Sequence, residues 1–159
     1  MGLLSMTCLH NENNDNNSPR QIRWHTANES IGIDNRCSAT ISHKIEDFIG
    51  QMRSSKRVIS GYGGTKTAGL KKGTILWKWN DDTGKTHHFK ITDSYYSPEG
   101  GMRLLSPQHW AKCLRKQTGK VASQLTTEDS ITLSWENGEH KRTVKLDDHT
   151  NVASLQMIK

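Results

Sequence analysis

The sequence has few cysteines and no long apolar run, and both absences exclude classes of protein. The three cysteines are odd in number and far apart, and no Cys-x-x-Cys pair occurs. We therefore expect neither a disulfide framework nor a cysteine-based zinc site. The roughly 18 consecutive apolar residues of a membrane-spanning helix occur nowhere, and residues 1–9 lack the basic flank of a signal peptide. These absences predict an intracellular protein of the cytoplasm or nucleus, with no membrane partner.

Apolar residues are also scarce, which indicates that part of the chain lies outside any core. Hydrophobic residues make up 32% of the 159 residues, and the mean hydropathy is -0.78. Residues 10–18 read HNENNDNNS, and such a tract cannot bury enough apolar surface to offset chain entropy. We predict a disordered Asn-rich tail over residues 1–28 and one folded domain over residues 29–159.

Basic residues outnumber acidic ones. The chain has 22 Lys and Arg against 16 Asp and Glu, which gives a formal net charge of +6. A basic balance favours polyanionic partners such as nucleic acid, but it is also an ordinary property of a solvated surface. The charge therefore gives only weak support to a nucleic-acid partner.

The remaining sequence alternates polar and apolar residues at the two-residue period of β-strands. A first strand begins at Ser30 and ends at Asp34. Residues 73–79 and 87–92 flank a turn-prone segment, and residues 130–135 and 140–145 flank an Asn-Gly pair, so each pair predicts a hairpin. About eight strand-like runs without strand–helix alternation predict a mainly β fold, a small closed antiparallel barrel.

One helix is predicted in the second half of the chain. Pro107 suits the first turn of a helix, and Ser106 before it is a typical N-cap residue. The helix would continue through Leu114. The apolar spacing within residues 43–52 indicates a further short helical turn.

A carboxylate at a tight turn is the first candidate site. Asp34 ends the first predicted strand and is followed by the turn residues Asn35, Arg36 and Cys37. Aspartic proteases use a carboxylate presented in this way as a catalytic acid. An acid that only closes its own turn would give the same pattern. No histidine is fixed next to the Cys37 thiol, so we expect packing there rather than a nucleophile.

A glycine-rich segment is the second candidate. It consists of Gly61, Tyr62, Gly63 and Gly64, and it follows the strand-like residues 58–60. No Gly-Lys-Ser/Thr follows and no helix starts there, which excludes a phosphate-binding loop. A flap that covers a site and a plain hairpin tip are both consistent with this sequence.

The order of these segments resembles the protease region of copia-class retrotransposon Gag-Pol polyproteins. That region has a strand ending in Asp-Ser/Thr-Gly-Ala, then a flap, then a Tyr-Val-Pro segment that closes with Asn-Leu-Leu-Ser. Here the Asp34 turn and the glycine-rich segment are followed by Tyr-Tyr-Ser-Pro at 95–98 and Arg-Leu-Leu-Ser at 103–106. The resemblance covers residues 30–115, and residues 128–159 look like extra C-terminal strands that follow in such polyproteins.

The resemblance implies a retropepsin-like barrel of the acid-protease type, in which two chains pair as a homodimer. Each chain would give one aspartate, here Asp34, to a dyad that shares a proton and activates water. The substrate would be a polyprotein peptide, and the reaction would need no cofactor and no metal.

The chain departs from the family motif directly after Asp34. Asn35 and Arg36 stand where the family has a hydroxyl residue and a glycine, and Arg36 cannot reproduce the close backbone approach of glycine. A guanidinium about 4 Å from the carboxylate would favour ionisation by about 4 kcal/mol, whereas a side chain pointing into solvent would act much less. The sequence predicts a weak or inactive aspartic-type endopeptidase. An active homodimeric protease and a basic nucleic-acid or polyprotein binding module are the alternatives.

Three further pairs of residues are weaker candidates for ligand sites. His87 and His88 are neighbours, so in a strand they point to opposite faces and are poorly placed to bind one metal ion together. Cys8 and His10 lie in the predicted disordered tail. Trp77 and Trp79 share one face of a predicted strand, which is more typical of a core than of a platform for stacking bases.

Overall fold

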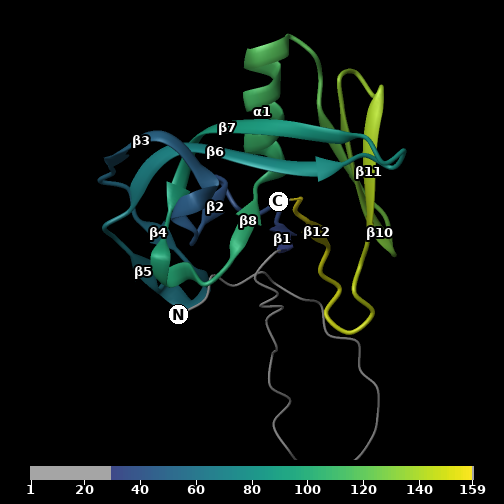
Figure 1. Ribbon diagram of the computed structural model, residues 1–159. Coiled ribbons are helices and arrows are strands. Elements are labelled where there is room, and N and C mark those ends of the chain that lie inside the picture. Colours follow the sequence, from purple (N-terminus) through teal and green to yellow (C-terminus); the bar gives the residue numbers. More distant parts are fainter. Residues whose placement is uncertain (1–29, 159) are drawn as a thin grey trace, which may run out of the picture.

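The computed structural model describes residues 30–158, which form β-strands and one α-helix (Figure 1). Residues 1–29 and 159 lie outside the described residues, and so does the predicted disordered tail with Cys8 and His10. The strands are β1 (Ser30–Ile33), β2 (Ile41–Ser42), β3 (Phe48–Ser54), β4 (Ile59–Ser60), β5 (Lys66–Thr67), β6 (Lys71–Asn80), β7 (Thr86–Tyr96), β8 (Arg103–Leu105), β9 (Ser123–Thr126), β10 (Ser130–Trp135), β11 (His140–Lys145) and β12 (Ser154–Gln156). The α-helix is α1 (Pro107–Thr118), and the single 3-10 turns are η1 (Ile45–Asp47), η2 (Tyr62–Gly64) and η3 (Pro98–Gly100).

Seven strands form one open sheet in the order β12-β1-β8-β2-β7-β6-β3. β1 pairs with β8 in parallel, as β2 does with β7, and the other pairs of this sheet are antiparallel. β9, β10 and β11 form a second sheet, and β4 and β5 form a separate hairpin. The prediction of a mainly β fold is confirmed, but the prediction of a closed antiparallel barrel is wrong, since no sheet within residues 30–158 closes on itself. The alternating pattern shows which face of a strand is buried, not which strand lies beside it.

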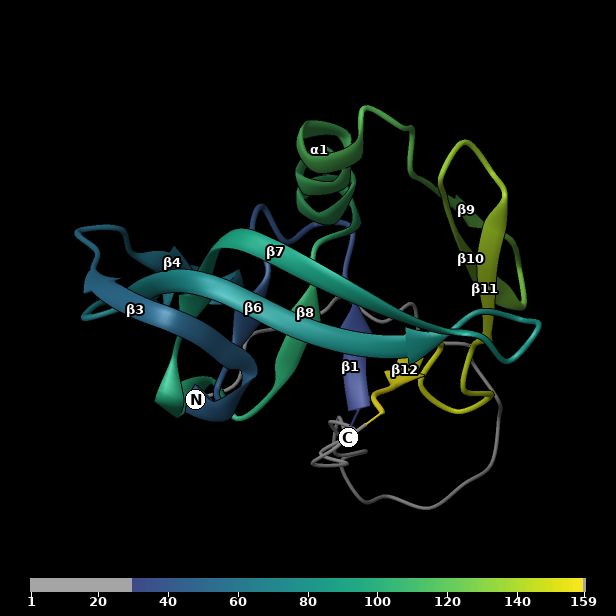
Figure 2. The same ribbon diagram turned by 45° about the horizontal axis from the view of Figure 1, so that its top comes forward.

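The long hairpin of β6 and β7 spans the molecule (Figures 1 and 2). It forms where the sequence predicts it, and β7 extends beyond the predicted residues to Tyr96. Gly73 pairs with Ser94 and Ile75 pairs with Ile91, so two residues of β7 face one residue of β6. One of these two is Asp93, whose φ of +59° is in the left-handed region. This β-bulge changes the direction of the side chains at one end of the hairpin.

The core joins both sheets to α1 through aromatic rings. Trp79 on β6 stacks on Phe89 of β7, with ring centroids 3.9 Å apart. Phe89 also contacts Trp110 of α1 at 5.8 Å and Trp135 of β10 at 5.3 Å. With Trp77, the tryptophans of this cluster are at most 2% exposed. In Figure 2, α1 covers the middle of the long hairpin and the second sheet lies at the hairpin's tip.

The helix and the second hairpin form as predicted. Ser106 is the N-cap of α1, because its hydroxyl accepts a hydrogen bond from the backbone N–H of His109, and Pro107 follows it. β10 and β11 have the predicted bounds. The helical turn predicted within residues 43–52 is reduced to η1, after which the chain enters β3. The glycine-rich segment joins β4 to β5 rather than to β6, and β2 and β9 were not predicted.

A buried ion pair fixes the turn between β2 and β3. The Arg103 guanidinium on β8 donates to both carboxylate oxygens of Asp47, at 2.7 and 3.0 Å. The Ser42 hydroxyl also donates to this carboxylate. All three side chains are at most 5% exposed, so the charges are paired where water could not solvate them.

Candidate functional site

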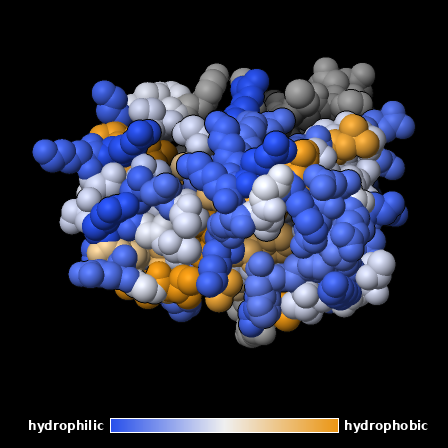
Figure 3. Space-filling model, turned by 90° about the horizontal axis from the view of Figure 1, so that it is seen from above, coloured by the Kyte–Doolittle hydropathy of each residue, from blue (hydrophilic) through white to orange (hydrophobic). Residues whose placement is uncertain are grey.

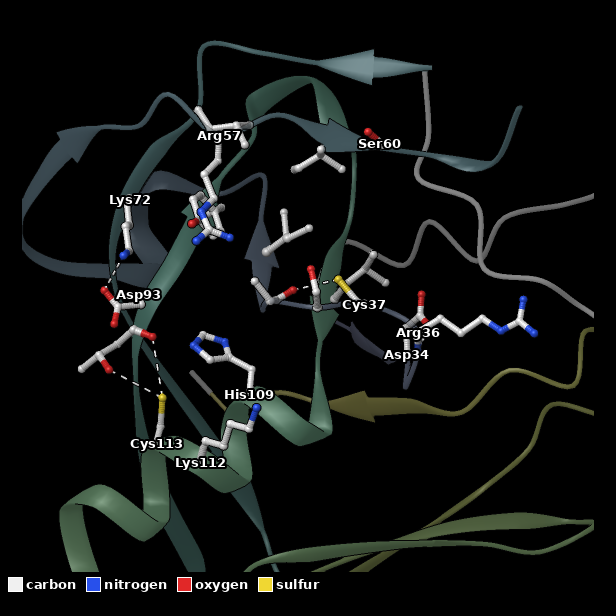
Figure 4. A pocket seen from close by; sticks show the side chains of 18 of the residues that line it. Asp34, Arg36, Cys37, Arg57, Ser60, Lys72, Asp93, His109, Lys112 and Cys113 are labelled. Atoms are coloured by element: carbon white, nitrogen blue, oxygen red, sulfur yellow. Dashed lines mark hydrogen bonds and ion pairs between the residues drawn. The ribbon is translucent and has the colours of Figure 1, made fainter. Parts of the chain in front are cut away.

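A cavity of about 870 Å³ lies at the end of the molecule that carries the β4–β5 hairpin. Its wall combines the Asp34 turn, the approach to β4 and its hairpin, the bulged end of β6 and β7, and one face of α1 (Figure 4). The residues with chemical functions are Asp34, Arg36, Cys37, Arg57, Ser60, Lys72, Asp93, His109, Lys112, Cys113, Arg115 and Lys116. The two segments singled out from the sequence therefore border the same space.

The backbone contacts of Asp34 fix the position of its turn. The N–H of Asp34 donates to the carbonyl of Leu105 at 3.0 Å, which continues the β1–β8 pairing. One carboxylate oxygen of Asp34, Oδ1, accepts the N–H of Arg36 at 2.9 Å. The carbonyl of Asn35 accepts the side-chain amide of Gln108 from α1. Asp34 thus closes its own turn with one oxygen, and the turn is tied to β8 and α1.

Arg36 points into solvent rather than toward the Asp34 carboxylate. Its side chain is exposed and extends away from the cavity (Figure 4). Asn35 is exposed as well. The two residues that follow Asp34 therefore lie on the outer side of the turn.

The glycine-rich segment contributes less to the cavity wall than predicted. Ser60 and Gly61 line the cavity, whereas Gly63 and Gly64 are exposed at the tip of the hairpin. Both tip glycines have φ near +80° (81° and 80°), a conformation that other residues rarely adopt. Tyr62 begins η2. The base of the hairpin, rather than its tip, is the part next to Asp34.

Asp93 is a second carboxylate at the cavity. The Lys72 ammonium lies 2.8 Å from its Oδ1, and the Arg53 guanidinium lies 4.0 Å from the same oxygen. The hydrogen bond from Lys72 lowers the pKa of Asp93 below its ordinary value, despite an opposing effect of partial burial. Asp93 is therefore ionised at neutral pH and is poorly suited to share a proton with Asp34.

His109 is the imidazole of the site. Its Nδ1 accepts the backbone N–H of Thr40 at 3.1 Å, so this nitrogen carries no proton. Burial lowers the pKa of His109 from its ordinary value, against a backbone hydrogen bond at Thr92 that raises it. In Figure 4, His109 and Arg57 extend toward the same space from opposite walls. The ring is therefore neutral at pH 7 and is held by hydrogen bonds to the backbone at Thr40 and Thr92.

The two cysteines at the cavity are not activated nucleophiles. The Cys37 thiol donates to the carbonyl of Ala39 at 2.7 Å. Burial raises the pKa of Cys37 to about 11, so its reactive thiolate form is rare at neutral pH. Cys113 is buried on α1, and its sulfur lies 3.7 Å from the carbonyl of Thr92. This geometry agrees with the prediction of packing.

Positive charge dominates the cavity wall. Besides Arg36, whose side chain extends away from the cavity, five basic residues line it, against the two carboxylates of Asp34 and Asp93. Sequence reasoning missed the contributions of Arg57, Lys72 and Asp93, since these come from an irregular segment and a bulge. The cavity residues of α1 could have been found from their spacing in the sequence. Positions 109, 112, 113 and 116 follow the spacing of one helical face.

Other surfaces give less support to binding. Trp77 and Trp79 are fully buried, so they cannot stack on exposed bases. Figure 3 shows a mainly hydrophilic face with small, separate apolar patches. Among residues 30–158, no helix has the length and apolar character needed to cross a bilayer. The clusters of described side chains that are spaced to ligate a metal ion do not include residues of the cavity.

The sequence and the fold were compared with known proteins. No protein-family model matches the chain, and neither the curated proteins nor the solved structures contain a match to it.

Proposed function

We propose that this chain is a retropepsin-like domain of a copia-class retrotransposon polyprotein, and that it binds an extended polyprotein segment in the cavity while hydrolysing it weakly or not at all. The observation that carries the proposal is that Asp34 and the base of the β4–β5 hairpin line one cavity. An acid and a covering hairpin around a shared space are what the family resemblance implies. A cavity of about 870 Å³ falls within the size range of ligand pockets.

The charges of the cavity indicate which peptides it would bind. Basic side chains from three walls, among them Arg57, Lys72 and Lys112, face two carboxylates. One of these basic groups, Lys72, is already paired with Asp93. The remaining positive charge favours peptides that carry acidic side chains, because complementary charge speeds encounter and excludes like-charged partners.

Weak hydrolysis follows from the number and state of the acids. Proton sharing in aspartic proteases needs two adjacent carboxylates, of which one is protonated. Within the described chain, Asp93 is the other carboxylate of the cavity, and its ion pair with Lys72 keeps it ionised. Asp34 alone can orient a water molecule, but residues 30–158 place no protonated partner acid beside it in the cavity.

Peptide binding and cleavage by the purified chain test this proposal. Acidic and basic decapeptides of matched length are titrated against the chain, and cleavage of a fluorogenic peptide library is followed between pH 4 and pH 7. We expect binding of the acidic peptides that weakens in Arg57→Ala, with little or no cleavage. Lys141 is exposed on β11 and lies outside the cavity lining, so Lys141→Ala is the matched control. Equal binding of both peptide classes, or no binding, contradicts the proposal.

An active homodimer is the second candidate, because the outer side of the Asp34 turn is accessible. Asn35 and Arg36 are exposed there, and a second copy could supply the missing carboxylate. Sedimentation at rising concentration combined with the cleavage assay tests it. Cleavage that appears with dimer, is lost in Asp34→Asn and persists in the exposed control Asp148→Asn would establish the protease and overturn the inactive form of the proposal. A chain that stays monomeric without cleavage excludes it.

A further inference from the structure

Three side chains that commonly bind metal ions converge at the far tip of the long hairpin. They are Asp81, which directly follows β6, His87 on β7 and His140 at the start of β11. One ligand atom from each lies within 4.8 Å of those of the other two. The carboxylate oxygen Oδ2 of Asp81 is 2.8 Å from His87 Nε2 and 3.4 Å from His140 Nδ1. None of the three residues lines the cavity.

The Asp81 carboxylate is held in place by its own turn. Its other oxygen, Oδ1, accepts hydrogen bonds from the N–H of Thr83 at 2.9 Å, the hydroxyl of Thr83 at 2.6 Å and the N–H of Lys85 at 3.0 Å. The side chain is 3% exposed. These hydrogen bonds fix Oδ1, and Oδ2 is left facing the two imidazoles.

The imidazole rings are also fixed before any ligand binds. The His87 ring packs edge-on against Trp135, with centroids 4.9 Å apart, and the His140 ring lies 5.8 Å from the same indole. The two imidazole centroids are 4.5 Å apart. His140 Nε2, on the far side of its ring, is 3.8 Å from a carboxylate oxygen of Glu139. In metal sites, the ring nitrogen of a histidine that does not bind the metal commonly donates a hydrogen bond to a carboxylate.

We propose that Asp81 Oδ2, His87 Nε2 and His140 Nδ1 bind a divalent transition-metal ion of the zinc class. Two imidazoles and one carboxylate are a ligand set that zinc accepts, and a water molecule would complete a tetrahedron. Bond lengths of about 2.1 Å place tetrahedral ligand atoms about 3.4 Å apart. The Asp81–His140 distance already fits, and His87 would have to move outward by about half an ångström. Only a nitrogen with a free lone pair can ligate, so His87 Nε2 must carry no proton in the bound state. A neutral ring exchanges its Nε2 proton for one at Nδ1 and stays neutral, and a protonated ring releases the Nε2 proton to solvent.

The bound ion would join the two sheets. Asp81 and His87 belong to the β6–β7 hairpin of the large sheet, and His140 belongs to the second sheet. This contact already contains the N–H of Asp82 donating to the carbonyl of Lys141 at 2.8 Å, and the Asp82 carboxylate accepting from Thr143. A metal ion at this place acts on the stability of the sheet contact. The inference is independent of the function proposed for the cavity.

Zinc titration of the full chain, purified without a histidine tag and stripped with a chelator, tests the inference. Calorimetry and metal analysis by mass spectrometry measure affinity and stoichiometry, and thermal unfolding is followed with and without ZnCl₂. We expect one zinc per chain and a rise in Tm on binding. His140→Gln should weaken binding about tenfold or more, as loss of a ligand does. His88→Gln should bind as the parent chain does, because His88 is exposed on the opposite face of β7.

The variants also separate a specific site from loose binding. His88→Gln keeps every other histidine and all cysteines, including Cys8 and His10, so it reports any binding outside the cluster. Circular dichroism of His140→Gln without metal confirms that it folds, and Asp81→Asn serves as a second ligand variant. Zinc binding that is equal in His140→Gln and His88→Gln, or a stoichiometry well below one, overturns the inference. In that case the three side chains form only a hydrogen-bonded cluster.

Discussion

The two ends of the long β6–β7 hairpin are stabilised by different kinds of interaction. At its tip, Trp79, Phe89 and Trp135 pack ring against ring within a continuous core. At its bulged end, the cavity rests on a small cluster whose buried members are Ile41, Leu70 and Tyr95, and all three line the cavity. The aromatic core therefore fixes how the two sheets pack against each other, whereas a few side chains and polar contacts determine the shape of the cavity.

The two ion pairs at the cavity end differ in burial and therefore in strength. The Asp47–Arg103 pair is buried and bidentate, and it anchors the segment between β2 and β3. The Lys72–Asp93 pair has an aspartate side chain that is 52% exposed, so water screens it. Breaking the first pair should alter the fold, whereas breaking the second should alter the charge of the cavity alone.

The largest effect is expected from Trp79→Ala in the aromatic core. The indole is fully buried and stacked on Phe89, so its removal leaves a cavity and should lower the free energy of unfolding by about 4 kcal/mol. Urea denaturation followed by circular dichroism measures this change. Leu70→Ala in the small cluster is the comparison and should cost about 2 kcal/mol. Equal losses in the two variants would contradict the contrast between the two ends.

A somewhat smaller loss is expected from Asp47→Asn. It leaves the Arg103 charge buried without its carboxylate, and breaking such a pair costs about 3 kcal/mol or more. The matched control is Asp93→Asn, which should change the free energy of unfolding by less than about 1 kcal/mol because that pair is half exposed. Both variants are compared by urea denaturation at pH 7. A loss for Asp93→Asn as large as that for Asp47→Asn would show that the exposed pair also holds the fold.

The sequence predicts local structure at these two ends better than it predicts how segments meet. The Asn-Gly hairpin, the β6–β7 hairpin and the Ser106–Pro107 helix start depend on neighbouring residues, and all three are confirmed. The closed barrel was wrong because sheet closure depends on pairings between distant strands. β2 pairs with β7 and β8 at Tyr95, Tyr96 and Leu104, which lie more than fifty residues further along the chain.

In the candidate sites too, local motifs are easier to predict than contacts between distant segments. The Asp34 turn and the glycine-rich segment were recognisable as continuous motifs, and the structure brings Asp34 and Gly61 to one cavity. The Asp81–His87–His140 cluster was missed, because comparing His87 with its neighbour His88 excluded a metal site within one strand. His140 and His87 come into contact only because the two sheets pack against each other. No local sequence pattern predicts that contact.

A modest effect is expected at the start of α1. The Ser106 hydroxyl accepts the N–H of His109 at 3.3 Å, and Ser106→Ala should lower the free energy of unfolding by about 1 kcal/mol. Ser106→Gly should cost only a few tenths of a kcal/mol through the cap itself, as glycine is tolerated at this position. Thermal and urea unfolding of the two variants distinguish them. If alanine proves no worse than glycine, the cap contributes little and α1 is held by Trp110 in the core.

The smallest effect on stability at neutral pH concerns Cys37, a partly buried residue of the cavity wall. Burial raises the pKa of its thiol to about 11, so the folded state favours the protonated form. This contribution is fully present below the ordinary thiol pKa of about 8.5 and is lost as the pH rises toward the folded value. Alkylation by iodoacetamide at pH 8 should therefore be about a hundredfold slower at Cys37 than in the same chain unfolded in guanidinium. Peptide mass spectrometry measures both rates. Equal rates would mean that the Cys37 side of the cavity opens to solvent, and the aromatic end would then be the only rigid part of the hairpin.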